Sequence, residues 1–358
     1  MLDHVTPFFA LLASVLVLMP LAWHIRSRNV GTIALSVWLV LGNLDNFVNS
    51  MAWWNGLENK APGFCDISIR LRHALFIAIP ASNLVIARKL ESIASTRQVR
   101  TTAADQKKSV IIDLLISLGI PIVYVSLMIV NQSSRYAIIE EAGCWPLLVT
   151  SWVWVLLVAA PVIIVSVASA VYSVLAFRWF WIRRRQFQAV LASSASTINK
   201  SRYIRLLVLT ATDMLIFFPI YVGSIGSEIQ TAITIPYGSW SSVHANFNEV
   251  PQYSTEVIMM QASFQRNLIL SRLVCPISGF IFFAMFGLGE ESRQGYKNAL
   301  CKVLTFLKLR KEPKQSRPEP VVANIEVVTF RSRDTYCATD ASPSSEKFDD
   351  NPSKLEEA

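Results

Sequence analysis

The chain has 358 residues, of which 53% are hydrophobic and only 16% are charged, and its mean hydropathy is positive. This apolar content exceeds what the core of a soluble protein of this length needs, so it indicates a surface that faces lipid. The formal net charge of +8 could suggest nucleic-acid binding, but most basic residues lie beside apolar runs, where membrane insertion alone accounts for them. We therefore expect no nucleic-acid partner.

Seven apolar runs follow one another along the chain, and about 20 apolar residues are enough for a helix to cross the hydrocarbon core. Because backbone groups in lipid must hydrogen-bond within their own segment, we expect the runs to be helices. The sequence thus predicts an all-α membrane protein, a seven-transmembrane-helix bundle. The runs cover residues 5–23, 30–53, 67–86, 110–130, 147–177, 206–226 and 267–289.

The basic residues of the loops predict the orientation of the bundle. Residues 24–29 hold two Lys or Arg, residues 88–109 hold six and residues 178–205 hold seven, whereas each alternate loop holds one. Cytoplasmic loops carry the excess of Lys and Arg. We therefore expect the N-terminus outside, the C-terminal tail inside, and a first span that is retained as a signal anchor.

Two cysteines fall on the predicted outer side. Cys65 directly precedes the third span, and Cys144 lies in the second outer loop. A disulfide between them is the prediction for an oxidising compartment, with two free thiols as the alternative. Cys275 lies within the seventh span, where we expect it to serve packing.

The chain changes character after the seventh span. Over residues 290–311 apolar side chains recur at helical spacing among basic ones, which predicts an amphipathic eighth helix on the inner membrane surface, in contact with lipids. Cys301 in this helix is a candidate for palmitoylation. Residues 312–358 are rich in Pro, Ser, Thr and acidic residues, so we expect a disordered cytoplasmic tail.

Ionisable groups inside the spans are expensive and usually paired. Asp45, Asn46 and Asn49 share one arc of the second helix, which should therefore face the bundle. Arg272 enters the seventh helix at a comparable depth, and we predict an intramembrane Asp45–Arg272 ion pair. Asp213, in the inner half of the sixth helix, is expected to pair with basic residues from the cytosolic side. The competing interpretation is that all of these groups only stabilise the packing of the helices and do not contact a ligand.

Several kinds of function find no support in the sequence. Residues 267–289 contain no lysine that could form the Schiff base of a retinal protein. No segment has the pattern of an ion-channel selectivity filter. The four histidines show no ligand spacing, so we expect no metal, no cofactor and no enzymatic activity. No repeat relates the two halves of the chain, which disfavours common transporter folds. A seven-helix transporter or channel nevertheless stays open as the alternative to a receptor. The histidines are His4, His24, His73 and His244.

Short motifs spread over roughly residues 1–310 resemble one family of receptors. The Asp-Arg-Tyr and Asn-Pro-x-x-Tyr marks of rhodopsin-like receptors are absent, and the sequence instead resembles the fungal mating-pheromone receptors of the a-factor type, class D G-protein-coupled receptors, including those of smut fungi. The matching segments are Trp23-His-Ile-Arg-Ser-Arg-Asn-Val-Gly31, Gly42-Asn-Leu-Asp-Asn-Phe-Val-Asn49, Phe64-Cys-Asp-Ile67, Ala87-Arg-Lys-Leu-Glu91, Gly143-Cys-Trp-Pro146, Arg183-Arg-Arg-Gln-Phe187, Tyr203-Ile-Arg-Leu206 and Phe282-Phe-Ala-Met-Phe-Gly287.

The resemblance implies a plasma-membrane receptor for a farnesylated peptide pheromone that signals to a heterotrimeric G protein; it leaves open whether receptors form homo-oligomers. A farnesyl chain requires an apolar pocket between the outer helix halves. As ligand contacts we predict Asn49, Arg72, His73, Trp240, His244 and Arg272. As G-protein contacts we predict Arg88, Lys89, Arg183, Arg184, Arg185 and Arg205, although charges that only set topology would lie in the same places.

Overall fold

The computed structural model describes residues 5–95, 102–183, 185, 200–289, 292–293 and 295–296. Contacts divide the chain into two units, Met1–Ser292 and Arg293–Ala358, and every element described below belongs to the first. The predicted amphipathic helix over 290–311, with Cys301, lies outside the described residues apart from four positions. The predicted disordered tail over 312–358 lies wholly outside them.

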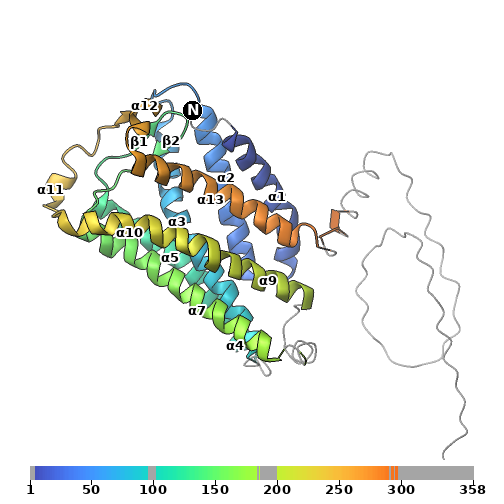
Figure 1. Ribbon diagram of the computed structural model, residues 1–358. Helices are drawn as coiled ribbons and strands as arrows, with labels where there is room; N and C mark the ends of the chain where they lie inside the picture. The colour runs from blue at the N-terminus through green and yellow to red at the C-terminus, as the bar shows by residue number, and fades with distance from the viewer. Residues whose placement is uncertain are drawn as a thin grey trace, which may run out of the picture. The chain divides into compact units, whose positions relative to one another are not determined.

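Seven helical segments within the described residues are long and apolar enough to cross a membrane, which confirms the predicted seven-helix membrane fold. Figure 1 shows them side by side in one bundle. The spans are α1 (Thr6–Arg26); α2 (Val30–Ala52); α3 (Pro62–Ala94); α4 (Ala103–Leu114), η1 (Leu115–Gly119), α5 (Ile120–Met128) and η2 (Ile129–Asn131); α6 (Trp152–Trp154), η3 (Val155–Ala159) and α7 (Ala160–Arg183); α9 (Lys200–Thr212), η4 (Asp213–Phe217) and α10 (Phe218–Thr234); and α13 (Ala262–Phe286).

The third span extends beyond its predicted bounds of 67–86 at both ends. Helix α3 begins five residues earlier, at Pro62, and continues to Ala94. Two arginines near the start of the predicted span are accommodated within the helix, because Arg72 forms an ion pair with Asp45 of α2 and Arg70 donates a hydrogen bond to the Asp66 carbonyl. A paired charge costs far less in a membrane bundle than an isolated one.

The fourth, fifth and sixth spans each contain a π-helical segment that lies just before a proline. A proline has no N–H to donate and its ring crowds the preceding turn. A wider π turn rearranges the hydrogen bonds in the residues before it, and such turns are common at functional sites. Segments η1, η3 and η4 each end two residues before a proline, namely Pro121, Pro161 and Pro219.

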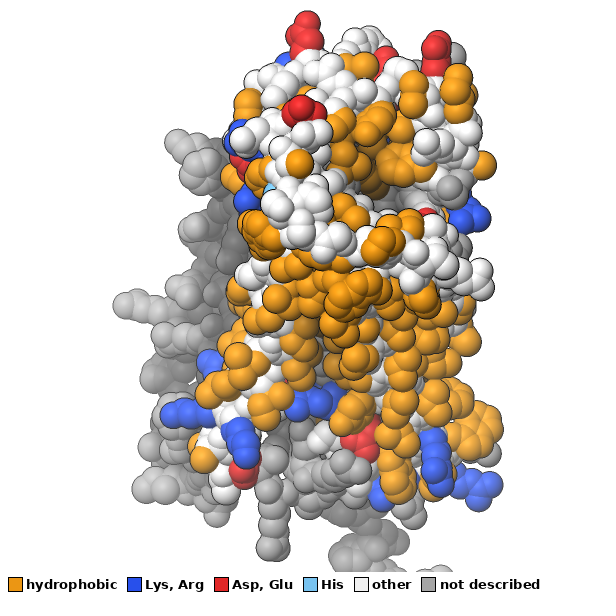
Figure 2. Space-filling model, turned by 90° about the vertical axis from the view of Figure 1, so that its left-hand side faces the viewer, with side chains coloured by type: hydrophobic (Ala, Val, Ile, Leu, Met, Phe, Trp, Pro, Cys, Tyr) orange, Lys and Arg blue, Asp and Glu red, His pale blue; other side chains and the backbone are white. Residues whose placement is uncertain are grey.

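Helix α3 lies at the centre of the bundle and packs against α2, α5, α7 and α9. Its buried side chains join both large hydrophobic clusters of the core; Ile79 belongs to one and Ile77 to the other. Large apolar side chains on the outward helix faces stay exposed, such as Leu215 at 67%. Figure 2 shows the resulting hydrophobic band, with Lys and Arg gathered toward its lower edge. This pattern is that of a multi-pass membrane protein.

One end of the bundle carries a small sheet, and we call it the strand end. Strands β1 (Ala137–Ile139) and β2 (Gly143–Trp145) are antiparallel, and β3 (Gln252–Tyr253) runs parallel to β1, giving the order β2-β1-β3. The short helices α11 (Trp240–Val243) and α12 (Thr255–Met259) precede and follow β3 along the chain. The opposite end, where α3 and α7 finish, is called the basic end.

The predicted disulfide is present. Cys65 near the start of α3 is bonded to Cys144 in β2, and both residues are fully buried. The bond joins segments 79 residues apart in the chain and fixes β2 over the strand end of α3. Around it lie Trp53, Ile69 and Tyr136 as a compact apolar cluster.

Candidate functional site

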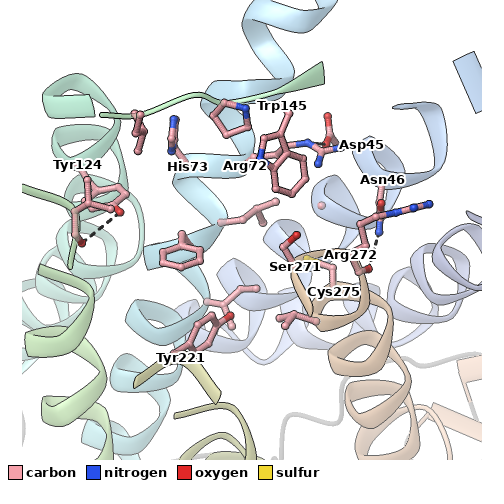
Figure 3. Close-up of a pocket in the computed structure, with 18 of the residues that line it drawn as sticks. Asp45, Asn46, Arg72, His73, Tyr124, Trp145, Tyr221, Ser271, Arg272 and Cys275 are labelled. Carbon is pink, nitrogen blue, oxygen red and sulfur yellow. Dashed lines mark hydrogen bonds and ion pairs between the residues drawn. The ribbon is translucent and has the colours of Figure 1, made fainter. Parts of the chain in front are cut away.

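A cavity with polar side chains on one side of its wall lies at the strand end, between α2, α3, α5, α6, α10, α13 and β2 with the residues that follow it. Its volume is about 250 Å³. Figure 3 shows the side chains that converge on it. The lining residues are Gly42, Asp45, Asn46, Arg72, His73, Leu75, Phe76, Ile79, Tyr124, Trp145, Pro146, Leu148, Trp154, Val158, Tyr221, Ser271, Arg272, Val274 and Cys275.

Most of the cavity wall is apolar. Phe76 of α3 and Tyr221 of α10 meet edge to face, with ring centroids 5.6 Å apart. Val158 of η3 and Tyr124 of α5 belong to the same buried cluster. Apolar walls with a few fixed polar groups are typical of ligand pockets, and this wall would favour an apolar ligand.

The polar side of the cavity is organised by Arg72. Its Nε donates a hydrogen bond to the Asp45 Oδ2 atom at 2.9 Å, and a terminal nitrogen donates to the Ala142 carbonyl at 3.3 Å. The guanidinium also lies 5.0 Å from the centre of the Trp145 ring, within the range of a cation–π contact. One side chain thus connects α2, α3 and the β2 segment.

The prediction that Asp45 forms an ion pair with Arg272 named the wrong arginine. Asp45 pairs with Arg72, while the Arg272 guanidinium donates a hydrogen bond to Ser50 Oγ at 3.0 Å. The Arg272 carbonyl accepts a hydrogen bond from Asn46 at 2.7 Å, so α13 and α2 are still joined at this depth. The physical reason is that Arg72, inside α3, already supplies the positive charge that Asp45 needs.

Asn49 lies behind the cavity and is not among its lining residues. It is fully buried, and its amide nitrogen donates to Asp45 Oδ1 at 3.0 Å and to Ser68 Oγ at 2.9 Å. Its amide oxygen accepts from the Cys144 backbone N–H at 2.8 Å. These bonds give Asn49 a positioning role, since they hold α2, α3 and β2 in register around the Asp45–Arg72 pair.

His73 lies on the wall of the cavity, as predicted for a ligand contact. It follows Arg72 on α3, is only 9% exposed, and points into the cavity (Figure 3). Its Nε2 atom has no hydrogen-bond partner among the described residues. A buried polar atom without a partner costs free energy, so this nitrogen is available to a polar group of a ligand.

The structure does not bring Trp240 and His244 into the cavity. Both belong to the α11 segment, where their rings stack with centroids 3.9 Å apart. The His244 Nε2 atom lies 2.9 Å from the Ile129 carbonyl oxygen, which ties α11 to the end of the fourth span. Trp240 is 55% exposed, so the pair belongs to the strand-end surface.

An ion pair outside the cavity also supports the strand end. The Asp66 carboxylate accepts two hydrogen bonds from the Arg135 guanidinium. This bond raises the pKa of Arg135 above its ordinary value, so the guanidinium stays charged. The contact ties the second outer loop to α3 beside the disulfide.

The cavity contains aromatic residues that the sequence analysis did not single out. Tyr124, Trp154 and Tyr221 lie inside apolar runs, where nothing in the sequence separates a cavity wall from a packed core. Trp145 carried a usable signal, because it directly follows Cys144 in a motif that the disulfide holds against α3.

The predicted coupling residues lie at the basic end in different environments. Arg88 forms an ion pair with Asp113 of α4 at 2.5 Å. Arg183 donates to the Ala94 carbonyl at 3.3 Å and lies over the Trp179 ring. Lys89 is half-buried, Arg185 is exposed, Arg205 donates to Ser201 Oγ at 2.8 Å, and Arg184 lies outside the described residues.

Comparisons with known proteins identify the family. The family model described as the STE3 pheromone A receptor matches residues 5–306. The chain is 73% identical over 359 aligned residues to pheromone receptor 1 of Ustilago hordei, and the alignment covers 100% of both chains. It is 70% identical over 349 residues to pheromone receptor 1 of Mycosarcoma maydis, with 98% of each chain covered. Identity to the pheromone a factor receptor of Saccharomyces cerevisiae is 26% over 302 residues, which are 82% of this chain and 61% of that protein. The chain therefore belongs to the STE3 pheromone A receptor family of seven-helix G-protein-coupled receptors.

Proposed function

We propose that the strand-end cavity binds the farnesyl chain of a peptide pheromone and that the basic end transmits the signal to a heterotrimeric G protein in the cytoplasm. The observation that carries the proposal is a cavity of about 250 Å³ with a mainly apolar wall among the spans. An isoprenoid is the part of such a ligand that needs this wall, because each buried CH₂ contributes about 0.8 kcal/mol.

The polar groups are distributed as a lipopeptide would require. The apolar wall is formed by residues such as Phe76, Val158 and Tyr221, whereas Arg72 and His73 lie together on α3. We infer that the farnesyl group lies against the apolar wall and that the adjoining peptide group hydrogen-bonds His73. Arg272 would complete the polar side of the cavity, and Asn49 would support it from behind.

The rest of the peptide would extend over the strand-end surface. Trp240 and His244 present a stacked aromatic pair there, next to the β1-β2-β3 sheet. Aromatic side chains offer large contact areas at low entropic cost and are enriched in peptide interfaces. Their role in this proposal is peptide recognition and not farnesyl binding.

Two independent features support a strand end that faces outward at the plasma membrane. The Cys65–Cys144 disulfide lies at this end, and disulfides persist in oxidising compartments. The Lys and Arg excess falls in the loops of the opposite end, as cytoplasmic loops require. The G protein would then meet the predicted coupling residues Arg88, Lys89, Arg183, Arg184, Arg185 and Arg205.

Signal transmission would be a shift between two arrangements of the spans. A ligand shifts such an equilibrium only by its differential affinity for the two states. The cavity touches the sixth span through Tyr221 and the seventh through Arg272. Both spans contain a proline, Pro219 and Pro276, at which a helix can bend. Ligand binding would therefore favour a different packing of these two spans at the basic end.

The test uses pheromone purified from cells of the opposite mating type, with its farnesyl group intact or chemically removed. The receptor is expressed in cells that lack their own pheromone receptor and carry a G-protein reporter. We expect the intact peptide to activate the reporter and the de-farnesylated peptide to need a much higher concentration. Equal potency of the two peptides would contradict a farnesyl site, and a ligand-driven current without reporter activation would favour a channel.

A cavity variant sharpens this test. Val158→Trp places a larger side chain in the cavity, whereas Ile164→Trp, on the same span, changes a side chain that is 66% exposed. We expect the first variant to raise the half-maximal pheromone concentration by roughly tenfold or more, which corresponds to about 1.4 kcal/mol. The second variant should respond like the unmodified receptor at equal surface expression.

A further inference from the structure

A second, smaller cavity lies deeper in the bundle, toward the basic end. Its volume is about 20 Å³, which is enough space for one water-sized particle. It lies between α2, α3, the sixth span and α13, and Ile79 lines both this cavity and the larger one. The lining residues are Leu35, Leu39, Ile79, Asn83, Leu209, Thr212, Asp213, Phe217, Ser278 and Ile281.

A carboxylate lies on the wall of this small cavity. Asp213 is 9% exposed and stands at the start of η4, the π-helical segment of the sixth span. Its side-chain hydrogen-bond partner is the amide of Asn83 on α3, and no described basic residue forms an ion pair with it. Within the described residues, Asp213 therefore hydrogen-bonds a neutral amide instead of forming the predicted pair with basic residues from the cytosolic side.

Two further oxygen atoms at the cavity have no hydrogen-bond partner among the described residues. They are Asn83 Oδ1, on a residue that is 4% exposed, and Ser278 Oγ, on a residue that is 8% exposed. The Thr212 hydroxyl donates to the Val208 carbonyl at 2.9 Å, so its lone pairs remain able to accept or coordinate. A carboxylate, an amide oxygen and hydroxyl groups thus surround one small space.

We propose that Asn83, Asp213 and Ser278 form a binding site for a single monovalent cation of the size of sodium. The three side chains supply hard oxygen ligands and one negative charge. A divalent ion is disfavoured, because Ca²⁺ takes six to eight oxygen ligands and Mg²⁺ usually keeps several waters that this volume does not accommodate. A bound water would fit the volume but would leave the charge of an ionised carboxylate uncompensated at membrane depth.

The location gives the site a role in conformational equilibrium. Its ligands come from three different spans: the third, the sixth and the seventh. A cation held between them stabilises this arrangement of the spans in proportion to its occupancy. Ile79, which is 3% exposed, lines both the ion site and the strand-end cavity. A change in the shape of either cavity therefore alters the packing around this one side chain.

The site is tested without any pheromone, so the outcome does not depend on the proposed ligand. The purified receptor is heated in sodium chloride and in choline chloride at equal ionic strength. We expect an unfolding temperature several degrees higher in sodium than in choline, because an ion that binds only the folded receptor stabilises it. Potassium should give a smaller increase, because the cavity is small.

Three variants assign the effect to the site. Asp213→Asn and the milder Ser278→Ala should each lose most of the sodium-specific increase. Asp113→Asn is the matched control, because Asp113 is also a buried carboxylate of the bundle but is already paired with Arg88; this variant should keep the increase. Sodium-23 NMR line broadening by bound ion should likewise be lost in Asp213→Asn and Ser278→Ala and kept in Asp113→Asn.

Two results would overturn the proposal. One is equal unfolding temperatures of the unmodified receptor in sodium and choline, as expected if the cavity holds water or Asp213 is protonated. The other is a sodium-specific increase that persists in Ser278→Ala and Asp213→Asn alike, because the ion would then bind elsewhere.

Discussion

The Nε atom of Arg72 lies 2.9 Å from the Oδ2 atom of Asp45, and this ion pair joins α2 to α3 on the polar side of the strand-end cavity. Both side chains are largely removed from solvent, with exposures of 14% for Arg72 and 5% for Asp45. Through Ala142 and Trp145 the same arginine reaches the β2 segment. The pair therefore links the helices, the disulfide-bonded loop and the cavity wall.

Removal of one partner of this pair should be worse than removal of both. Asp45→Leu or Arg72→Leu leaves a buried charge without its partner, which costs about 3 kcal/mol or more, whereas replacing a buried pair by apolar residues is often close to neutral. We expect both single variants to lower the unfolding temperature more than the double variant does. Thermal unfolding of the purified receptors measures this, and additive losses would show that the pair is not coupled.

Gly143 occupies a position that no other residue fits. Its φ is +71°, and a Cβ atom there would lie 2.5 Å from the Asn49 Oδ1 atom. Asn49 is fully buried and cannot move away without breaking its bonds to Ser68 and Cys144. We expect Gly143→Ala to cost more than about 1 kcal/mol and to reduce pheromone affinity together with stability.

The control for this prediction is Gly223→Ala in α10, where a Cβ atom meets nothing within 4 Å. An alanine in an open helical position should be neutral or slightly stabilising. Both variants are compared by thermal unfolding and surface expression. A Gly143→Ala receptor as stable as Gly223→Ala would contradict the close contact with Asn49.

Loss of the Cys65–Cys144 disulfide should weaken the strand end. The bond closes a loop with a sequence separation of 79 residues, and cross-links of this span stabilise by about 4 kcal/mol in the chain-entropy account. We expect Cys65→Ser to lower the unfolding temperature and pheromone binding together. Mild reduction should reproduce the effect in the unmodified receptor and leave Cys65→Ser unchanged; a further loss in the variant would point to damage elsewhere.

Arg183 and Arg185 should differ although they are two residues apart. Arg183 binds the Ala94 carbonyl and lies over Trp179, whereas Arg185 is exposed. We expect Arg183→Ala to lower stability and Arg185→Ala to leave stability unchanged while it reduces G-protein activation. Unfolding temperature and nucleotide exchange by the G protein separate the two effects. Full signalling by Arg185→Ala at normal expression would remove this residue from the coupling surface.

The sequence predicted the features that the membrane itself enforces. Lipid requires long apolar helices, so the seven spans could be predicted. The same requirement placed Asp45, Asn46 and Asn49 inside the bundle, where all three are buried. The disulfide was predictable because only two cysteines were expected on the outer side.

The sequence could not predict which buried polar groups meet. Arg72 and Arg272 both lie at a depth suitable for Asp45, and the choice between them depends on the rotation of α3, which the sequence does not reveal because this helix is buried on most of its faces. Tyr124 and Tyr221 line the cavity for reasons of packing that exist only in three dimensions. Trp240 and His244 were assigned to the ligand from the composition of a loop, and the structure places them at the first residue and the C-cap of α11, outside the cavity.

The central claim is that the farnesyl group occupies the strand-end cavity, and photo-crosslinking tests it most directly. The probe is a farnesylcysteine peptide that carries a photoreactive diazirine on the isoprenoid chain, and the labelled residues are located by mass spectrometry. The account predicts labelling of cavity residues such as Phe76, Val158 and Tyr221, and loss of this labelling in the presence of excess purified pheromone. Labelling confined to lipid-facing residues such as Ile122 and Ile164, which are 65% and 66% exposed, with no competition by pheromone, would contradict it.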